Sequence, residues 1–425
     1  MSTTVLASGR AASRAALWRL HGWAALLASP FLIVAALTGL VYVPTPQVEA
    51  WQHGHLDAVS PGPWQPLEGL VAAAQRAAPE GTVLQHVTPP AVPGESLRVR
   101  FAAHHRPTGG EHAHSPGGGP VDVFVDPGTG AVLGVQAESE RFGHWAKNLH
   151  SRLLQSEAWR WAIEWAATCL LVMLVTGVAL AWPVLGSVLR PALGRARRWH
   201  LGVGVALAGL SLVIVLTGLT WSQTAGTQIR ALRDATGQAP PRMPKELRSE
   251  PVQAGAPVLG WDAVWAQARR EAPSQRLQIA PPRGASGVWR IGTPDRDRPW
   301  ARVELALHAQ SGRVLWRSTW ADQTAFSKAT AIGIPFHRGE FGLWNQALLA
   351  VFGLGVVAST VTGWAMWWRR RSAGGPVLLR PAAWVDVRWR WPVLTAAIAL
   401  CALVPLMAAF LAAVLLLEVL PPPRA

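Results

Sequence analysis

Five segments of this chain are long and apolar enough to cross a lipid bilayer, and no other feature restricts its fold as strongly. They cover approximately residues 20–43, 160–183, 199–221, 343–368 and 392–417. Each reaches the roughly 20 residues that an α-helix needs to span a hydrocarbon core of about 30 Å. Because backbone polar groups inside lipid must be satisfied within the segment, each is expected to be a helix. The sequence therefore predicts an α-helical membrane protein.

Basic residues beside these segments predict their orientation. Three short stretches, residues 10–19, 190–198 and 369–390, hold 13 of the 39 Lys and Arg residues, and Asp386 is their only acid. Such stretches mark cytoplasmic loops. We therefore expect a multi-pass protein of the bacterial inner membrane with a cytoplasmic N-terminus and an outer C-terminus. The formal charge of +15 is then a topology signal, which favours the lipid bilayer and not nucleic acid as the partner.

The N-terminus is Arg-rich and runs into apolar sequence, but it lacks a convincing cleavage motif, so we expect an uncleaved anchor. Two long outer segments each contain an amphipathic helical stretch, at 67–78 and 261–272, followed by a strand–turn–strand pattern, at 121–133 and 302–316. They predict two related α+β domains. The expected order is a basic segment with the first span (1–43), the first outer domain (44–158), the second span (159–183), a cytoplasmic loop (184–198), the third span (199–221), the second outer domain (222–342), the fourth span (343–368), a basic cytoplasmic loop (369–391), a fifth helix (392–418) and a tail (419–425).

The two halves of the chain repeat one arrangement of histidines and Thr-Gly steps. Each half has a histidine, a helix ending in Thr-Gly, an outer segment, a second histidine and a returning helix with Thr-Gly. In chain order, each histidine and the Thr-Gly step that follows it are His21 and Thr38-Gly39, His150 and Thr176-Gly177, His200 and Thr217-Gly218, and His337 and Thr362-Gly363. The separations are 17 and 17 residues for the first and third, and 26 and 25 for the second and fourth. Equal orientation of the halves predicts a pseudo-two-fold axis along the membrane normal.

This symmetry predicts two histidine pairs at opposite membrane faces. His21 and His200 fall at the cytoplasmic ends of equivalent helices, and His150 and His337 fall at the outer ends of the other two. Two imidazoles that face one another across the axis can supply both axial ligands of a haem iron. Glycine in Thr-Gly leaves space for a macrocycle or a neighbouring backbone. By level, the steps at 176–177 and 362–363 lie near the cytoplasmic pair, and those at 38–39 and 217–218 nearer the outer pair.

Other interpretations stay open at this point. A lone histidine at a membrane-helix end is usually interfacial or a cap, Thr-Gly usually serves packing, and another metal is a further option. Glu164, early in the second span, is either a functional ionisable group or a headgroup-level residue. A second candidate metal cluster lies in a Gly- and Pro-rich insertion for which a flexible segment is the simpler interpretation. Its members are His104, His105, His112 and His114.

The residues around the four histidines resemble the PepSY-associated transmembrane family, which includes bacterial inner-membrane ferric-siderophore reductases. The matching segments are Leu20-His21 with 37–40, 149–154, Trp199-His200 with 216–219, 336–342, and 362–364 with Trp367-Trp368. The resemblance covers about residues 15–372. It implies a duplicated four-helix haem-binding bundle with two PepSY-like periplasmic domains, and a fifth helix of less clear role. It further implies two haem b groups, one held by His21 and His200 on the cytoplasmic side and one by His150 and His337 on the periplasmic side.

The activity that this resemblance implies is electron transfer to a ferric siderophore or other ferric chelate, with release of ferrous iron. The sequence shows no dinucleotide fingerprint, so the electrons are expected from a cytoplasmic donor or from quinol. No catalytic residue is assigned. One alternative is a transporter of iron, haem or siderophore, which predicts broken helices and polar residues at the membrane midplane. Another is a non-catalytic sensor or peptidase-modulating protein, which the PepSY-like domains alone would fit.

Overall fold

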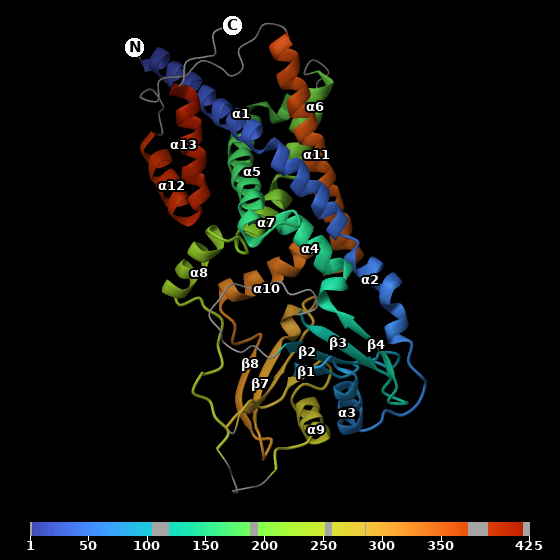
Figure 1. Ribbon diagram of the computed structural model, residues 1–425. Coiled ribbons are helices and arrows are strands. Elements are labelled where there is room, and N and C mark those ends of the chain that lie inside the picture. Colours follow the sequence, from blue (N-terminus) through green and yellow to red (C-terminus); the bar gives the residue numbers. More distant parts are fainter. Residues whose placement is uncertain are drawn as a thin grey trace. The chain divides into compact units, whose positions relative to one another are not determined.

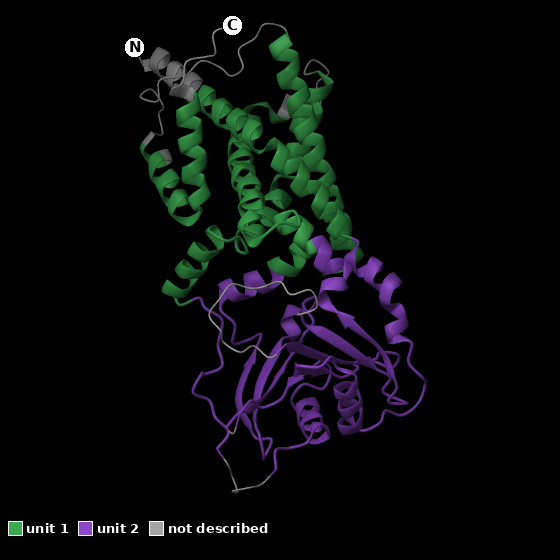
Figure 2. Cartoon of the chain, viewed as in Figure 1, with its two compact units in different colours: residues 1–43, 147–237, 333–425 green, residues 44–146, 238–332 purple. Residues whose placement is uncertain are grey.

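The computed structural model describes residues 2–103, 119–187, 194–250, 257–284, 286–372 and 390–419. The chain forms two compact units, coloured separately in Figure 2. The first, here called the helical unit, contains residues 1–43, 147–237 and 333–425. The second, here called the sheet unit, contains residues 44–146 and 238–332. Each unit is therefore assembled from segments that are far apart in the sequence.

Long helices dominate the helical unit. Among the described residues, three helical segments are long and apolar enough to cross a membrane, namely Ser13–Tyr42, Glu157–Leu185 and Leu343–Ser372. They confirm the first, second and fourth predicted spans. The helices concerned are α1 (Ser2–Tyr42), α5 (Arg160–Ala181) and α11 (Leu343–Ser372). Helix α1 packs against both α5 and α11.

The third span differs from the prediction, because it is broken. It consists of α6 (Arg195–Ala206) and α7 (Ala208–Leu219), which are bent by 59° at Leu207. The expected continuous helix over 199–221 is therefore wrong. Glycines at 202, 204 and 209 flank the bend and weaken helical preference there. Gly355 of α11 leaves room for the Leu207 side chain at the bend. A Cβ added at Gly355 would lie 2.1 Å from Cδ1 of Leu207. Helix α6 packs on α11 and α7 on α5, which closes a four-helix bundle.

The fifth predicted span is also two helices. Helices α12 (Arg390–Leu403) and α13 (Pro405–Val419) lie side by side as an antiparallel hairpin (Figure 1). Pro405 has no N–H and disfavours a helical conformation at the preceding Val404, which favours a break at this point. The end of α13 thus returns to the end of the helical unit at which α1 begins (Figure 1). This contradicts the single helix expected over 392–418.

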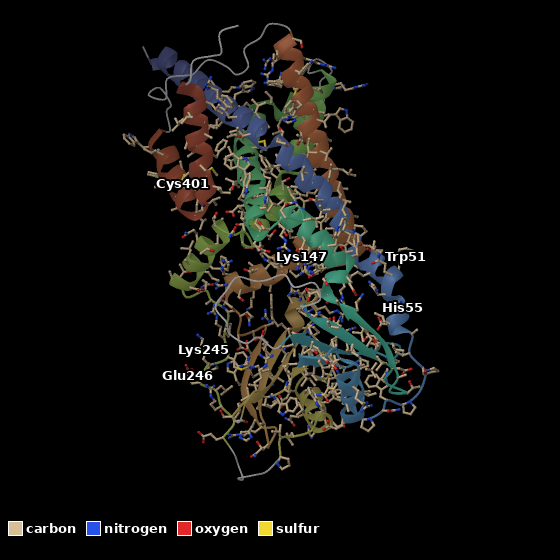
Figure 3. All side chains as sticks on the ribbon, viewed as in Figure 1. Trp51, His55, Lys147, Lys245, Glu246 and Cys401 are labelled. Carbon is tan, nitrogen blue, oxygen red and sulfur yellow. The ribbon has the colours of Figure 1, made fainter. Side chains whose placement is uncertain are left out.

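The hairpin is anchored by apolar packing. Phe410 of α13 is fully buried, and its ring lies 6.4 Å from that of Trp165 on α5. Cys401, labelled in Figure 3, lies on α12 and is a free thiol, as is the buried Cys169.

The sheet unit contains one eight-stranded antiparallel sheet in the order β4-β3-β2-β1-β5-β6-β7-β8. The hairpins β3–β4 and β7–β8 confirm the two predicted strand–turn–strand motifs, and α3 and α9 confirm the two predicted amphipathic helices. The strands are β1 (Thr82–Thr88), β2 (Leu97–Ala103), β3 (Val121–Val125), β4 (Val132–Ala137), β5 (Gln278–Ala280), β6 (Val288–Gly292), β7 (Val303–His308) and β8 (Val314–Thr319). The remaining helices of the chain are α2 (Thr45–His53), α3 (Leu67–Ala77), α4 (Phe142–Arg152), α8 (Ala225–Ala235), α9 (Trp261–Glu271) and α10 (Ala325–Arg338).

The two predicted outer domains, residues 44–158 and 222–342, are not separate in this structure. Strand β1 of the first half pairs with β5 of the second, with Val87 opposite Ile279. In two separate domains, β1 and β5 would be edge strands with unpaired backbone groups, and the pairing satisfies those groups. The correction is therefore from two domains to two halves of one sheet, with a shared core beneath α3 and α9.

Helices α3 and α9 also cap one another. The Asp262 carboxylate accepts hydrogen bonds from the backbone N–H groups of Leu67 (2.8 Å) and Glu68 (3.4 Å) at the start of α3. In return, Glu68 Oε1 accepts from the N–H of Trp261 at the start of α9, at 2.7 Å. A Cβ at Gly260 would lie 2.0 Å from Glu68 Oε1, so this exchange requires glycine there. Each half thus satisfies the helix N-terminus of the other.

Replacing Asp262 by Ala should destabilise the sheet unit by about 1 kcal/mol, because two N–H groups of α3 lose their acceptor. The denaturation midpoint of the full chain in detergent measures the effect. Asp297→Ala is the matched control, since Asp297 is exposed and, among the described residues, pairs with its neighbour Arg298. Equal midpoints for the two variants would contradict the capping role.

Candidate functional site

All four histidines of the repeat lie in the helical unit. His21 and His200 face each other. The rings of His21 on α1 and His200 on α6 have centroids 6.2 Å apart and planes at 89°. An ion bound between two imidazole nitrogens at about 2.0–2.1 Å each places the ring centroids roughly 6 Å apart, with each centroid ~1 Å behind its nitrogen. The observed separation therefore fits two imidazoles on opposite sides of one metal ion.

His150, near the end of α4, and His337, near the end of α10, form the second pair. The two rings are close enough for His337 to lower the pKa of His150 through its charge, a smaller effect than the lowering caused by burial. Burial likewise lowers the pKa of His337. Both residues lie outside the three helical segments that are long enough to span a membrane. Near pH 7 these imidazoles are therefore neutral, which is the form that binds metals.

The two pairs lie at different levels of the helical unit. His150 contacts Thr38 of α1, with 3.0 Å between Nδ1 and Oγ1. Thr38 follows His21 by 17 residues in the same helix, which corresponds to about 26 Å along the helix axis. The pairing and the separation of levels both agree with the arrangement predicted from the repeat.

Three of the four histidines contact the threonine of one Thr-Gly step. The threonine Oγ1 lies 3.1 Å from Nδ1 of His21 at Thr176, 3.0 Å from that of His150 at Thr38 and 3.1 Å from that of His337 at Thr217. His200 differs, because its Nδ1 contacts the Ser359 carbonyl at 2.9 Å. Ser359 stands three residues before Thr362 of the fourth Thr-Gly step.

Two imidazoles contact a carbonyl three residues before the threonine. Nδ1 of His200 contacts the Ser359 carbonyl at 2.9 Å, and Nδ1 of His337 contacts the Ile214 carbonyl at 3.0 Å. At His21 and His150 the acceptor is the threonine hydroxyl, whose own proton is donated within its helix. These oxygens can only accept, so each neutral imidazole carries its proton on Nδ1. Each Nε2 then keeps a lone pair for a metal, and the hydrogen bond at Nδ1 fixes the orientation of the ring.

The glycine of each step makes room for the imidazole. A Cβ added at Gly177 would lie 3.1 Å from Cε1 of His21, and one at Gly218 would lie 3.2 Å from Cε1 of His337. The corresponding distances are 3.4 Å from Gly39 to His150 and 3.5 Å from Gly363 to His200. The predicted levels of the four Thr-Gly steps are thus correct. Their predicted role needs a correction, since the group that approaches each glycine is a histidine ring.

The donor set indicates which group these pairs can hold. Within the described part of the chain, no group of three or more His, Cys, Asp or Glu side chains surrounds a possible metal position. Sites for a bare metal ion use three or four protein ligands. A haem iron takes four ligands from its own macrocycle and needs only axial ones from the protein. Two histidines per site fit that requirement. The candidate cluster His104, His105, His112 and His114 lies outside the described residues.

Glu164 has a structural role in this fold. It is 1% exposed on α5, and its carboxylate accepts from the N–H of Thr224 at 3.1 Å and of Ala225 at 2.8 Å. The Thr224 hydroxyl donates to the same carboxylate. Glu164 therefore caps the start of α8, where its charge also favours the helix dipole. This capping role differs from the two considered from the sequence, a functional ionisable group or a headgroup-level residue.

One contact beside the second pair was not predicted from the sequence. Arg338, which follows His337, donates from Nε to the hydroxyl of Tyr42 at 3.1 Å and pairs with Glu340 at 2.9 Å. Tyr42 is the only tyrosine of the chain and stands four residues after Thr38. The contact joins α1, whose Thr38 contacts His150, to the residue beside His337. Only the adjacency of Arg338 to His337 pointed to it.

Comparison with known proteins identifies a family for this chain. No curated protein matches the chain. The sequence profile described as the PepSY-associated TM region matches residues 18–370, a range that contains all four histidines and their Thr-Gly steps. The protein is therefore a member of the PepSY-associated transmembrane family.

Proposed function

We propose that this protein is a haem-dependent reductase of the bacterial inner membrane that passes electrons to a ferric siderophore or other ferric chelate. The observation that carries the proposal is the facing of His21 and His200 at 6.2 Å, in a tautomer that leaves both Nε2 atoms free to bind iron. The equivalent pair of His150 and His337 supplies a second site. Two sites at different levels of one bundle suit passage of electrons from one membrane face to the other.

In this proposal the chain positions its cofactors and does no covalent chemistry. Haem b, held by two imidazoles at each site, supplies reversible one-electron exchange. The histidines bind and orient, and the surrounding apolar helices exclude water. Each ferric ion that is reduced to ferrous takes one electron, so a two-electron donor such as quinol serves two ferric chelates and releases two protons. A reduced cytoplasmic protein is the other class of donor.

The basic residues give the proposed direction. Arg19, Arg198 and Arg369 flank the helix ends near His21 and His200, and the positive-inside rule places such residues in the cytoplasm. His21 and His200 would then form the cytoplasmic site, and His150 and His337 the periplasmic site. The chelate would be reduced on the periplasmic side.

A transporter is the second candidate, and the bend between α6 and α7 favours it. Broken helices are typical of transport sites. The residues at this bend are apolar, however, with Ala206, Leu207 and Ala208 in sequence. In sealed vesicles that contain the protein, a transporter would carry the ferric chelate with its iron across the membrane. A reductase would leave the chelate on the side where it was added.

The purified full-length protein should show a low-spin b-type visible spectrum, and the dithionite-reduced protein should be reoxidised by a ferric chelate with formation of ferrous iron. His200→Ala should lose the haem of the first site selectively, and His337→Ala that of the second. A colourless protein would eliminate the reductase and leave the sensor or peptidase-modulating function. Equal loss of both haems in both variants would show that the assignment of histidines to sites is wrong.

Gly177→Ala should impair haem binding at the first site more than Gly363→Ala does. The added methyl group would press on His21 at 3.1 Å, tighter than ordinary packing, but would meet His200 at an ordinary 3.5 Å. Haem content per chain and the visible spectrum measure the difference. The two variants form a matched pair, because each alters one helix beside the same site. A larger loss in Gly363→Ala would contradict the contacts described above.

A further inference from the structure

The four threonines of the Thr-Gly steps share one local arrangement but not one contact to histidine. Each hydroxyl donates to the carbonyl four residues earlier in its own helix, at 2.7 Å for Thr38, 2.6 Å for Thr176, 2.7 Å for Thr217 and 2.7 Å for Thr362. A hydroxyl has one proton, which is used in this bond, so toward any other group its oxygen can only accept. In Thr38, Thr176 and Thr217 that oxygen faces Nδ1 of a histidine.

Thr362 is the exception. Its hydroxyl contacts the carbonyls of Ala358 and Ser359 in its own helix, at 2.7 and 3.1 Å. Among the described residues it makes no hydrogen bond to His200, which rests on the Ser359 carbonyl alone. The first site is therefore asymmetric, with a threonine hydroxyl behind His21 and a carbonyl behind His200.

We propose that the hydroxyls of Thr176, Thr38 and Thr217 are positioning groups that tune the iron-binding strength of His21, His150 and His337, and that Thr362 has no such role. An acceptor at Nδ1–H gives the imidazole more negative character and makes Nε2 a stronger ligand. A stronger imidazole donor stabilises ferric over ferrous iron and so lowers the reduction potential. The effect on potential rests on the proposed haem, whereas the hydrogen bond itself does not.

Thr176→Val removes the hydroxyl and keeps the side-chain shape. We expect the reduction potential of the first site to rise by about 28 mV. For a one-electron couple this corresponds to a roughly threefold change in the ferric–ferrous equilibrium constant. A redox titration of the full-length protein in detergent measures the shift. Thr176→Ser should restore the original potential, because serine keeps the hydroxyl.

Thr362→Val is the matched control, since it alters the opposite helix beside the same site and should leave the potential unchanged. Equal shifts in Thr176→Val and Thr362→Val would overturn the proposal, as would no shift in either. Should Thr176→Val fail to bind haem, Thr38→Val and Thr217→Val test the same prediction at the second site. No shift in those variants would then overturn it.

A protein without haem at these histidines would refute the proposed function but not the hydrogen bond. In that case nitrogen-15 magnetic resonance of the histidine-labelled full chain gives the test. The Nδ1 resonance of His21 should move in Thr176→Val and stay in place in Thr362→Val. An unmoved resonance in both variants would overturn the hydroxyl contact itself.

Discussion

The contact of each imidazole Nδ1 with an oxygen acceptor of a neighbouring helix is the interaction on which this site depends. The acceptor is a threonine hydroxyl for His21 and His150, the Ser359 carbonyl for His200, and both a hydroxyl and a carbonyl for His337. This contact fixes the tautomer and the orientation of each ring, which lies against the glycine that follows the threonine. The bundle thus presents four oriented lone pairs, and the rings of His21 and His200 face each other.

Duplication shapes both units, but in different ways. In the helical unit each repeat contributes one histidine to each pair, so neither half alone contains a complete site. In the sheet unit the halves meet through β1 and β5 and exchange helix caps through Asp262 and Glu68. Both units therefore require the two halves of the chain together, although a span, a loop and a half-sheet each form locally.

The sequence predicted those features that a fixed spacing encodes. Equal separations placed His21 opposite His200, and alternating apolar residues around a Gly turn located the hairpins. The merged sheet could not be predicted in this way, because pairing of Val87 with Ile279 joins edge strands almost 200 residues apart without a local pattern. The cap on α8 by Glu164 joins residues about 60 apart, also without a local pattern. The hairpin of α12 and α13 was predictable, since Pro405 stands within an otherwise apolar run. In the sequence, only the glycines around Leu207 indicate the bend there.

The central claim is that each histidine couple holds one iron between two imidazoles. Electron paramagnetic resonance of the oxidised full-length protein, together with haem content per chain, tests it most directly. The account predicts two low-spin ferric signals and two haems per chain, since each iron has two strong axial nitrogen ligands. A high-spin signal, which reports an iron with an open axial position, or fewer than two haems in a fully loaded preparation would contradict it.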